Sequence, residues 1–383
     1  MKNFLTALSR SRFPYEPLIR VEISKGRLLH NLNEFRRIAP QESIAPVLKS
    51  NAYGHGLVEV AEILEHEKGI PFFVVDSYFE AIALRSSGIK ASLLVIGYNR
   101  PETMLDSKLK RVSFTVTSLE SLEALKDARH PIHIHLKIDT GMCRQGISIE
   151  EIPAAMERIR GNANIVLEGI CSHMPDADNA DTSFTDKQIA LWNDTAKRFK
   201  EAFPALKYVH LSNTDGHRFS KEITANVSRL GLGLYGLSDG STFKPALDLQ
   251  PVMEMKTIIT GVKHIKKGDA VGYGGTFTAA GDMTIATIPA GYFEGVDRRL
   301  SNIGIILVGP EKVACPIIGR VSMNITTIDV SKVRDAKIGM EAIVISDDPS
   351  GENSMNGIAK KCGTISYEIA ALVPAHLKRV VVE

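Results

Sequence analysis

The sequence is poor in several features that mark specialised classes of protein. Its 383 residues include four cysteines, and no two of them form a CxxC pair. That spacing argues against a zinc site or a disulfide framework, so we expect no bound metal and a reducing, cytoplasmic setting. An uninterrupted apolar run of about 18 residues, the length that spans a membrane, is also missing. The cysteines are Cys143, Cys171, Cys315 and Cys362.

Net charge is small as well. Lysine and arginine together number 46 and aspartate and glutamate 44, which gives a formal charge of +2. Without a run of like charges, this balance gives no reason to expect nucleic acid or an anionic membrane as a partner. The first 17 residues, MKNFLTALSRSRFPYEP, hold only a short apolar patch that serine and arginine interrupt. We therefore expect no secretory signal there.

The first two thirds of the chain alternate between short β-branched runs and longer amphipathic stretches, as in an α/β protein. Helical patterns cover 58–66, 118–128, 149–160 and 186–202. Alternating β and α segments predict a parallel sheet covered by helices, and eight such strands favour a (β/α)8 TIM barrel over an open sheet. The expected strands are 44–49, 71–76, 92–97, 113–117, 132–139, 165–172, 208–212 and 226–229.

The pattern changes after about Gly240. Between 249 and 330 short strands follow one another with glycine-rich turns and no helices between them. Such spacing predicts a separate, mostly antiparallel C-terminal β domain, with short helices near 356–361 and 366–372. We place the barrel domain at 1–243 and the β domain at 244–383, with the option that the first strand, about 17–24, packs with the β domain.

Polar residues stand at the carboxyl ends of the expected barrel strands, where barrel enzymes gather their functional groups. Each one alone has an ordinary explanation as an ion-pair or packing residue. Together, coming from different strands, they can converge on one site. They are Lys49, Asp76, Asp139, His173, Asn213 and Arg229.

Lys49 is the most informative of these candidates, because it directly follows an apolar run in PVLKSNAYGHG. A structural ion pair is one explanation. The other is a nucleophilic amine that forms a Schiff base with an aldehyde once it is removed from water. The residues after it, including Tyr53 and two glycines, offer a hydroxyl and adaptable backbone for holding a phosphate.

VLKSNAYGHG resembles the cofactor-lysine motif of the alanine racemases, which are PLP enzymes that join a TIM barrel to a β domain. Further segments resemble that family in the same order, from near residue 20 almost to the C-terminus. They are HLKIDTGMCRQGI (135–147), LEGICSH (167–173), HLSNTDG (210–216), SRLGLGLYG (228–236), VGYGGTF (271–277), IPAGYFEGVDRRLSN (288–302), GRVSMNI (319–325) and GTISYEI (363–369).

The resemblance implies a two-base racemisation of alanine. Lys49 would hold pyridoxal 5'-phosphate (PLP) covalently and serve as one base. Because the Cα proton must leave and return on either face, a second base has to lie opposite, and the family tyrosine there matches Tyr273. A phenol is a poor base in water and needs a cationic neighbour or the substrate carboxylate to assist it. By itself Tyr273 reads as a turn residue between glycines.

The remaining cofactor contacts follow from the matched positions. Arg229 would donate to the pyridine nitrogen and His173 would lie against the ring. An arginine does not readily give up its proton, so the ring would be a weaker electron sink than a protonated pyridinium. The other cofactor residues implied are Tyr53, Thr214 and Tyr367 with the backbone of Gly231 and Leu232 at the phosphate, and Asn213.

The resemblance also assigns residues to the substrate. Arg144 and Met323 would orient its carboxylate, and Tyr292 would narrow the entrance with Tyr367, which favours alanine over larger side chains. Lys137 matches a lysine that is often carbamylated in the family, although an ion pair inside the barrel explains it nearly as well.

Two positions depart from the family pattern. Asn324 stands where aspartate is usual, and Cys143 stands where glycine is more common. The amide keeps the size of aspartate and removes its charge, so the polarity near Tyr273 and the substrate carboxylate is expected to differ.

In the family, Tyr273, Tyr292 and Met323 reach the lysine of another subunit, which implies a homodimer with shared sites. The prediction is an alanine racemase that supplies D-alanine for peptidoglycan. The alternatives are a racemase of other small amino acids such as serine, a PLP-dependent decarboxylase of related fold, and a non-enzymatic PLP-binding protein. The sequence lacks the glycine-rich phosphate loop of the decarboxylases. A non-enzymatic PLP-binding protein would have no need of a second base, and therefore no need of the segment VGYGGTF that carries Tyr273.

Overall fold

A computed structural model describes residues 16–238, 242–244 and 246–383. Residues 1–15, most of the stretch considered above as a targeting signal, lie outside this range, as does Gly240, where the sequence pattern changes. Within the described ranges, a helix that combines the length and the apolar character for crossing a membrane is not found.

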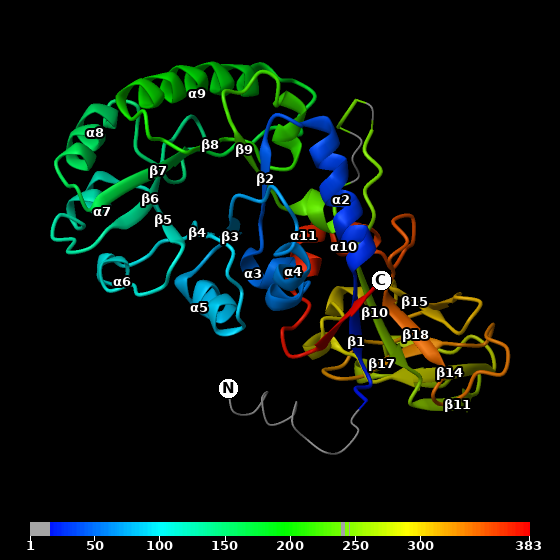
Figure 1. The fold of residues 1–383 in the computed structure, drawn as a ribbon. Coiled ribbons are helices and arrows are strands. Elements are labelled where there is room, and N and C mark those ends of the chain that lie inside the picture. The colour runs from blue at the N-terminus through cyan, green and yellow to red at the C-terminus, as the bar shows by residue number, and fades with distance from the viewer. Residues whose placement is uncertain (1–15, 239–241, 245) are drawn as a thin grey trace.

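The larger lobe is a ring of parallel strands surrounded by helices (Figure 1). Strands β3 to β8 form one sheet in sequence order, and β2 pairs with β9 in parallel. A bridge between Val47 and Val74 joins β2 to β3, and the Asn226 amide donates to the Val209 carbonyl to join β8 to β9. The ring is therefore closed, and the predicted barrel is confirmed. Its strands are β2 (Ser43–Pro46), β3 (Phe73–Val75), β4 (Leu93–Val95), β5 (Val112–Val116), β6 (Ile132–Lys137), β7 (Ile165–Cys171), β8 (Tyr208–His210) and β9 (Val227–Leu230).

Helices of the barrel lobe begin at residues suited to that place. Ser24 accepts from the Arg27 amide at 3.3 Å, and Ser77 with Glu80 forms a reciprocal capping box. Such caps satisfy amide groups that have no partner inside the first turn. The helices are α2 (Lys25–Ile38), α4 (Leu57–Leu64), α5 (Tyr78–Ser86), α6 (Pro101–Leu105), α7 (Leu119–Glu123), α8 (Ile152–Arg160) and α9 (Ser183–Ala202), and the segment labelled α3 (Lys49–Tyr53) is a left-handed turn.

The smaller lobe is built mostly from antiparallel pairs, as expected, and contains one parallel pair. One sheet has the order β16-β15-β18-β10-β1-β19, a second has the order β11-β14-β17, and β12 pairs with β13. Two strands of the first sheet, β18 and β19, were not anticipated from the sequence. The elements are β1 (Arg20–Ser24), β10 (Met253–Ile258), β11 (Gly261–Ile265), β12 (Ala270–Val271), β13 (Phe277–Thr278), β14 (Met283–Ile288), β15 (Ile305–Val308), β16 (Val313–Pro316), β17 (Thr326–Asp329), β18 (Glu341–Ile345), α10 (Met355–Cys362), α11 (Ser366–Ala371) and β19 (Lys378–Val382).

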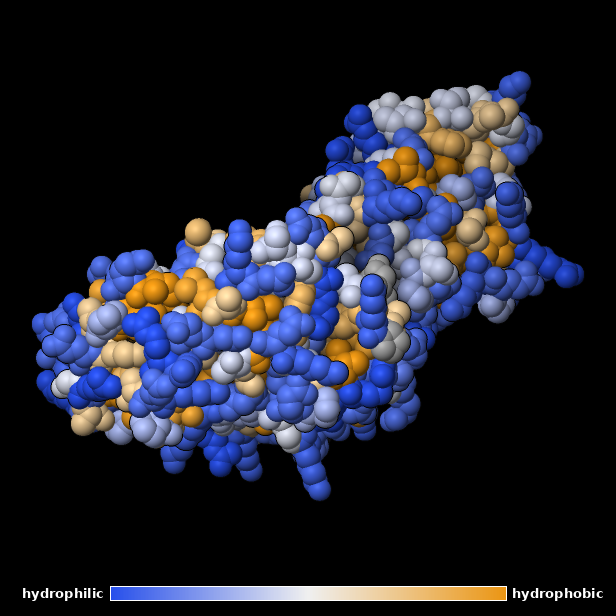
Figure 2. All heavy atoms as spheres, turned by 90° about the horizontal axis from the view of Figure 1, so that it is seen from above, coloured by the Kyte–Doolittle hydropathy of each residue, from blue (hydrophilic) through white to orange (hydrophobic). Residues whose placement is uncertain are grey.

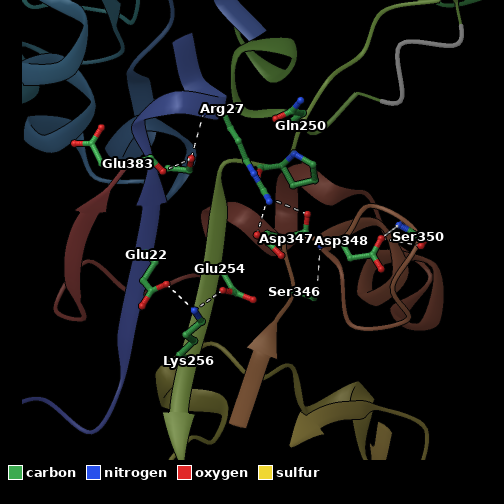
Figure 3. A network of polar contacts seen from close by, with 12 residues as sticks. Glu22, Arg27, Gln250, Glu254, Lys256, Ser346, Asp347, Asp348, Ser350 and Glu383 are labelled. Atoms are coloured by element: carbon green, nitrogen blue, oxygen red, sulfur yellow. Dashed lines mark hydrogen bonds and ion pairs between the residues drawn. The ribbon is translucent and has the colours of Figure 1, made fainter. Parts of the chain in front are cut away.

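Strand β1 ties the two lobes together, because it lies in the sheet of the smaller lobe and leads directly into helix α2 of the barrel. It pairs antiparallel with β10 and parallel with β19. Figure 3 shows Lys256 of β10 between two carboxylates, Glu22 and Glu254, with both contacts at 2.7 Å. Arg27 at the start of α2 reaches Asp347 at 2.7 Å. The Lys256 contacts hold β1 in the sheet of the smaller lobe, and the Arg27 contact joins the barrel to the β domain.

Seen from above, the molecule is elongated, and apolar and charged side chains share the surface of both lobes (Figure 2). Several large apolar side chains are exposed on the β domain and at the end of the chain. They are Tyr273, Tyr292, Phe293, Ile303, Met323, Ile325, Ile365 and Leu372. A single chain leaves these groups in water, and a surface that gathers such groups is typical of contact with another protein.

Candidate active site

A cavity of about 570 Å³ opens at the carboxyl end of the barrel strands. Its walls come from all eight barrel strands or the residues that follow them and from α11, so distant parts of the chain meet there. Asp139, expected at the end of the fifth strand, does not line it, but most of the other predicted residues do. They include Lys49, Tyr53, Lys137, Arg144, His173, Asn213, Thr214, Arg229, Gly231, Leu232 and Tyr367.

Lys49 lies three residues beyond the end of β2, where we expected it to end the strand itself. The chain then makes a left-handed turn, with φ between 51° and 57° at Ser50, Asn51, Ala52 and Tyr53. Residues other than glycine rarely adopt this backbone conformation, which costs them about 1–2 kcal/mol each. The Asn51 side chain helps to hold it by accepting from the Leu57 amide at 2.9 Å. The turn lets both Lys49 and Tyr53 line the cavity.

One end of the cavity is suited to an anion. The Tyr53 hydroxyl lies so close to Gly231 that a Cβ on that glycine would stand 2.9 Å from it. The hydroxyl of buried Thr214 accepts from the Gly233 amide at 3.2 Å. Burial raises the pKa of Tyr367 to about 12 and that of Tyr53 further, so both phenols stay protonated and can donate.

Arg229 is the most heavily bonded side chain of the site. Its guanidinium donates to the carbonyl groups of Ser172 at 2.7 Å, Leu211 at 2.9 Å and His210 at 3.1 Å. It also lies 3.3 Å from Nδ1 of His173. Burial and then the charge of Arg229 lower the pKa of His173 to about 3, so that imidazole is neutral. A fixed cation is thus held against the floor of the cavity.

Behind Arg229 lies a chain of histidines that the sequence did not reveal. The guanidinium lies 2.5 Å from Nδ1 of His210, whose Nε2 lies 2.8 Å from Nδ1 of His135. Burial lowers the pKa of His135 to about 3 and that of His210 well below its usual value, so both rings are neutral. Each ring can therefore accept at one nitrogen and donate at the other. A Cβ on Gly169 would collide with the His135 ring, so that glycine makes room for it.

The rest of the cavity is rich in cations. Burial lowers the pKa of Lys137, and the nearby charges of Arg229 and Arg144 lower it further. Among the described residues, no carboxylate lies within 4.0 Å of its amine as an ion-pair partner. The ion pair considered from the sequence is therefore not present there. Asp76 also lines the cavity.

Asp139 orders the loop that carries Arg144. Its carboxylate accepts from the amides of Gly141 at 2.9 Å and Cys143 at 3.1 Å. Cys143 has a φ of 54°, in the region that favours glycine. The backbone here thus suits the glycine that we expected to be usual at this position, and the cysteine side chain is exposed.

Asn213 holds the following turn in place rather than standing free in the cavity. It donates to the Met174 carbonyl at 3.0 Å and accepts from the Gly216 amide at 3.0 Å. Other lining residues that the sequence did not single out include Thr115, Gln145, Cys171 and Ser172. Over the described ranges, no group of three or more metal-ligating side chains is assembled.

Three predicted residues of the β domain also do not line this cavity. Tyr273, Tyr292 and Met323 all belong to the β domain and are exposed, Tyr273 to 72%. Within one chain, the predicted second base is therefore not brought to Lys49. A site that uses both groups would need a second chain.

A closed barrel joined to a β domain, with a lysine, phenol hydroxyls and an arginine around one cavity, is the arrangement of a two-domain barrel enzyme. Family models for the alanine racemase N-terminal and C-terminal domains match residues 23–239 and 252–381. The alanine racemase of Methanococcus maripaludis is 33% identical over 366 residues, covering 94% of this chain and 97% of that one.

Solved structures agree with this match. An alanine racemase from Clostridium difficile superposes with a TM-score of 0.89 at 31% identity, covering 97% of both chains. The enzyme from Bacillus anthracis, solved with bound L-Ala-P, has a TM-score of 0.87 at 30% identity and covers 97% of this chain and 96% of that chain. The chain belongs to the alanine racemase family.

Proposed function

We propose that this protein interconverts L- and D-alanine with PLP as its cofactor. The observation that carries the proposal is the convergence of Lys49, the phenol and hydroxyl donors and Arg229 on one cavity of suitable size. Membership of the family supports the substrate. We further propose that the enzyme works in the cytoplasm and that its D-alanine serves peptidoglycan.

The residues present fit PLP. The Lys49 amine can bind its aldehyde, and Tyr53, Thr214, Tyr367 and the amides of Gly231 and Leu232 can surround its phosphate. When bound, PLP supplies an electron sink that makes the Cα proton of an attached amino acid removable. Asn213 orders the turn that carries Thr214.

Arg229 sets the character of that sink. Its two terminal nitrogens are held by three carbonyl groups, and its Nε–H can meet the ring nitrogen with a hydrogen bond without releasing a proton to it. Neutral His173, beside Arg229, can pack on the ring without adding charge. A sink of limited strength favours return of the proton to Cα over transfer elsewhere.

Two bases would share the proton transfer. Lys49 Nζ takes or returns the Cα proton on one face, and Tyr273 Oη of the partner subunit does so on the other. We propose a homodimer because Tyr273 is exposed in the single chain while Lys49 lines the cavity. The exposed apolar groups of the β domain would then be covered by the partner's barrel.

Substrate selection would rest on residues from both subunits. Arg144 would pair with the substrate carboxylate, with Met323 of the partner subunit beside it. Tyr367 of the same subunit, together with Tyr292 of the partner subunit, would limit the side chain of the substrate to the size of alanine. Carbamylation of Lys137 would turn a crowded cation into an anion that can hold Arg144 in place, and its pKa, lowered by burial, favours the neutral amine that reacts with carbon dioxide.

The direct test is to incubate the purified holoenzyme with L-alanine or L-serine and to measure the D-isomers by chiral chromatography. We expect rapid formation of D-alanine and much slower formation of D-serine. A Tyr273→Phe variant should lose racemisation while keeping the cofactor absorbance of the wild type, because the phenol does not bind PLP. Full activity in that variant would refute the two-base assignment, and bound PLP without D-alanine formation would refute the proposed reaction.

A further inference from the structure

Two segments of the β domain that carry proposed substrate residues are bonded to one another. The turn Tyr292–Glu294 packs along the loop 321–325. The Tyr292 amide donates to the Ser322 carbonyl at 3.0 Å, and the Phe293 amide donates to the Met323 carbonyl at 2.9 Å. A Cβ on Gly291 would collide with both carbonyl groups, so the backbones touch directly.

A side-chain pair closes this contact. Asn324 Nδ2 donates to Glu294 Oε1 at 2.6 Å, and the Gly291 amide donates to Glu294 Oε2 at 2.9 Å. Glu294 is 8% exposed, and its carboxylate is therefore buried. Each of its two oxygens accepts from one neutral donor. A buried carboxylate left without such donors is costly, so the pair holds the two segments in one arrangement.

We propose that the hydrogen bond between Glu294 and Asn324 sets the size selectivity of the site by fixing the spacing of Tyr292 and Met323. Both side chains are exposed, and each belongs to one of the two bonded segments. The inference rests on the proposed function, in which these two side chains face the substrate in the partner's cavity. Glu294 and Asn324 are then positioning residues that touch no substrate.

The proposal explains why an amide at 324 suits this chain. Aspartate at that position would bring a second carboxylate against Glu294, and two carboxylates at hydrogen-bond distance cannot both be ionised. One would have to hold a proton, so the contact would survive at low pH and fail as pH rises. Glutamine at 294 would restore the bond with reversed polarity, because its amide can donate to the aspartate while its oxygen accepts from the Gly291 amide.

The test compares wild type with Asn324→Asp, Glu294→Gln/Asn324→Asp and a control. In Asn33→Asp the same change of charge falls on an exposed asparagine of α2, whose side-chain oxygen accepts from Arg36 Nη1 at 3.1 Å. The measurements are kcat and KM for L-alanine and L-serine across pH, and hydrogen–deuterium exchange of the peptide spanning 291–296. Exchange reports the amides of Tyr292 and Phe293 directly and does not depend on activity.

At pH values above the usual pKa range of carboxyl groups, we expect Asn324→Asp to lower the alanine-to-serine ratio of kcat/KM by about fivefold to tenfold. The change should arise mainly from a higher KM for alanine. Exchange in 291–296 should rise in the same pH range, and both effects should shrink at low pH. The double variant and Asn33→Asp should resemble wild type. If Asn324→Asp fails to fold, Asn324→Ser carries the same expectations without the pH dependence.

Unchanged exchange and selectivity in Asn324→Asp would overturn the inference, as would a double variant no better than the single one. Increased exchange with unchanged selectivity would also overturn it, because the bond would then be structural alone. A wild type that forms no D-alanine would instead refute the proposed function, and the exchange data would still report on the contact.

Discussion

Replacing Arg229 with methionine should destabilise the barrel by an amount that the structure allows us to estimate. The substitution removes the donors to the carbonyl groups of Ser172, Leu211 and His210. The His210 carbonyl keeps a second donor, the Ser172 amide at 3.1 Å, so its loss counts little. The carbonyl groups of Ser172 and Leu211 lose their Arg229 donors. At about 1–3 kcal/mol for each buried acceptor left unpaired, the free energy of unfolding should fall by about 2–6 kcal/mol.

Urea unfolding measures this loss. The single tryptophan, Trp192, is fully buried in helix α9, so its fluorescence should follow the unfolding of the barrel. Arg334→Met is a matched control, because that side chain is 90% exposed, and it should change the free energy of unfolding by less than about 0.5 kcal/mol.

The substitution should also raise the pKa of His173 and His210, since the charge of Arg229 helps to lower both. A loss of stability below about 1 kcal/mol would contradict the role of Arg229 as the group that holds these strand ends together.

Two further predictions concern the barrel. Burial raises the pKa of Glu42 to about 7 from its usual 4.5, so its contribution to stability is present below pH 4.5 and is lost as pH rises through 7. Glu42→Gln should therefore be more stable than wild type by about 3 kcal/mol above that range and no more stable below about pH 4, as measured by urea unfolding at each pH. Gly231→Ala places a methyl group 2.9 Å from the Tyr53 hydroxyl and should weaken PLP binding by roughly tenfold or more in a titration followed by absorbance; unchanged affinity would show that the phosphate does not lie there.

The order of elements could be predicted from the sequence, and so could the strand-end residues such as Lys49 and Arg229, because strand ends in a barrel must converge. The other residues of the cavity were assigned by the family resemblance. The left-handed turn after Lys49 could not be predicted, since hydrophobic periodicity carries no information about φ and only Asn51 of its four residues tolerates that region readily. The strand β19 was missed because its partner β1 stands at the other end of the chain.

The histidine chain behind Arg229 was missed for a related reason. His135 and His210 are separated by 75 residues, and in their strands each reads as an ordinary inward or outward residue. Only the closed barrel brings the two rings together. Tyr273 is the opposite case. The family resemblance assigned it the role of second base, but the fold of a single chain does not bring it to Lys49.

The central claim is that one site takes Lys49 from one chain and Tyr273 from another. Lys49→Ala and Tyr273→Phe should each be nearly inactive alone. Mixed by co-expression or by unfolding and refolding together, they form dimers of which about half contain one chain of each kind, and in those one site of two has both native bases. We predict recovery of about a quarter of wild-type activity per chain. A mixture that stays as inactive as the two variants would contradict the shared site.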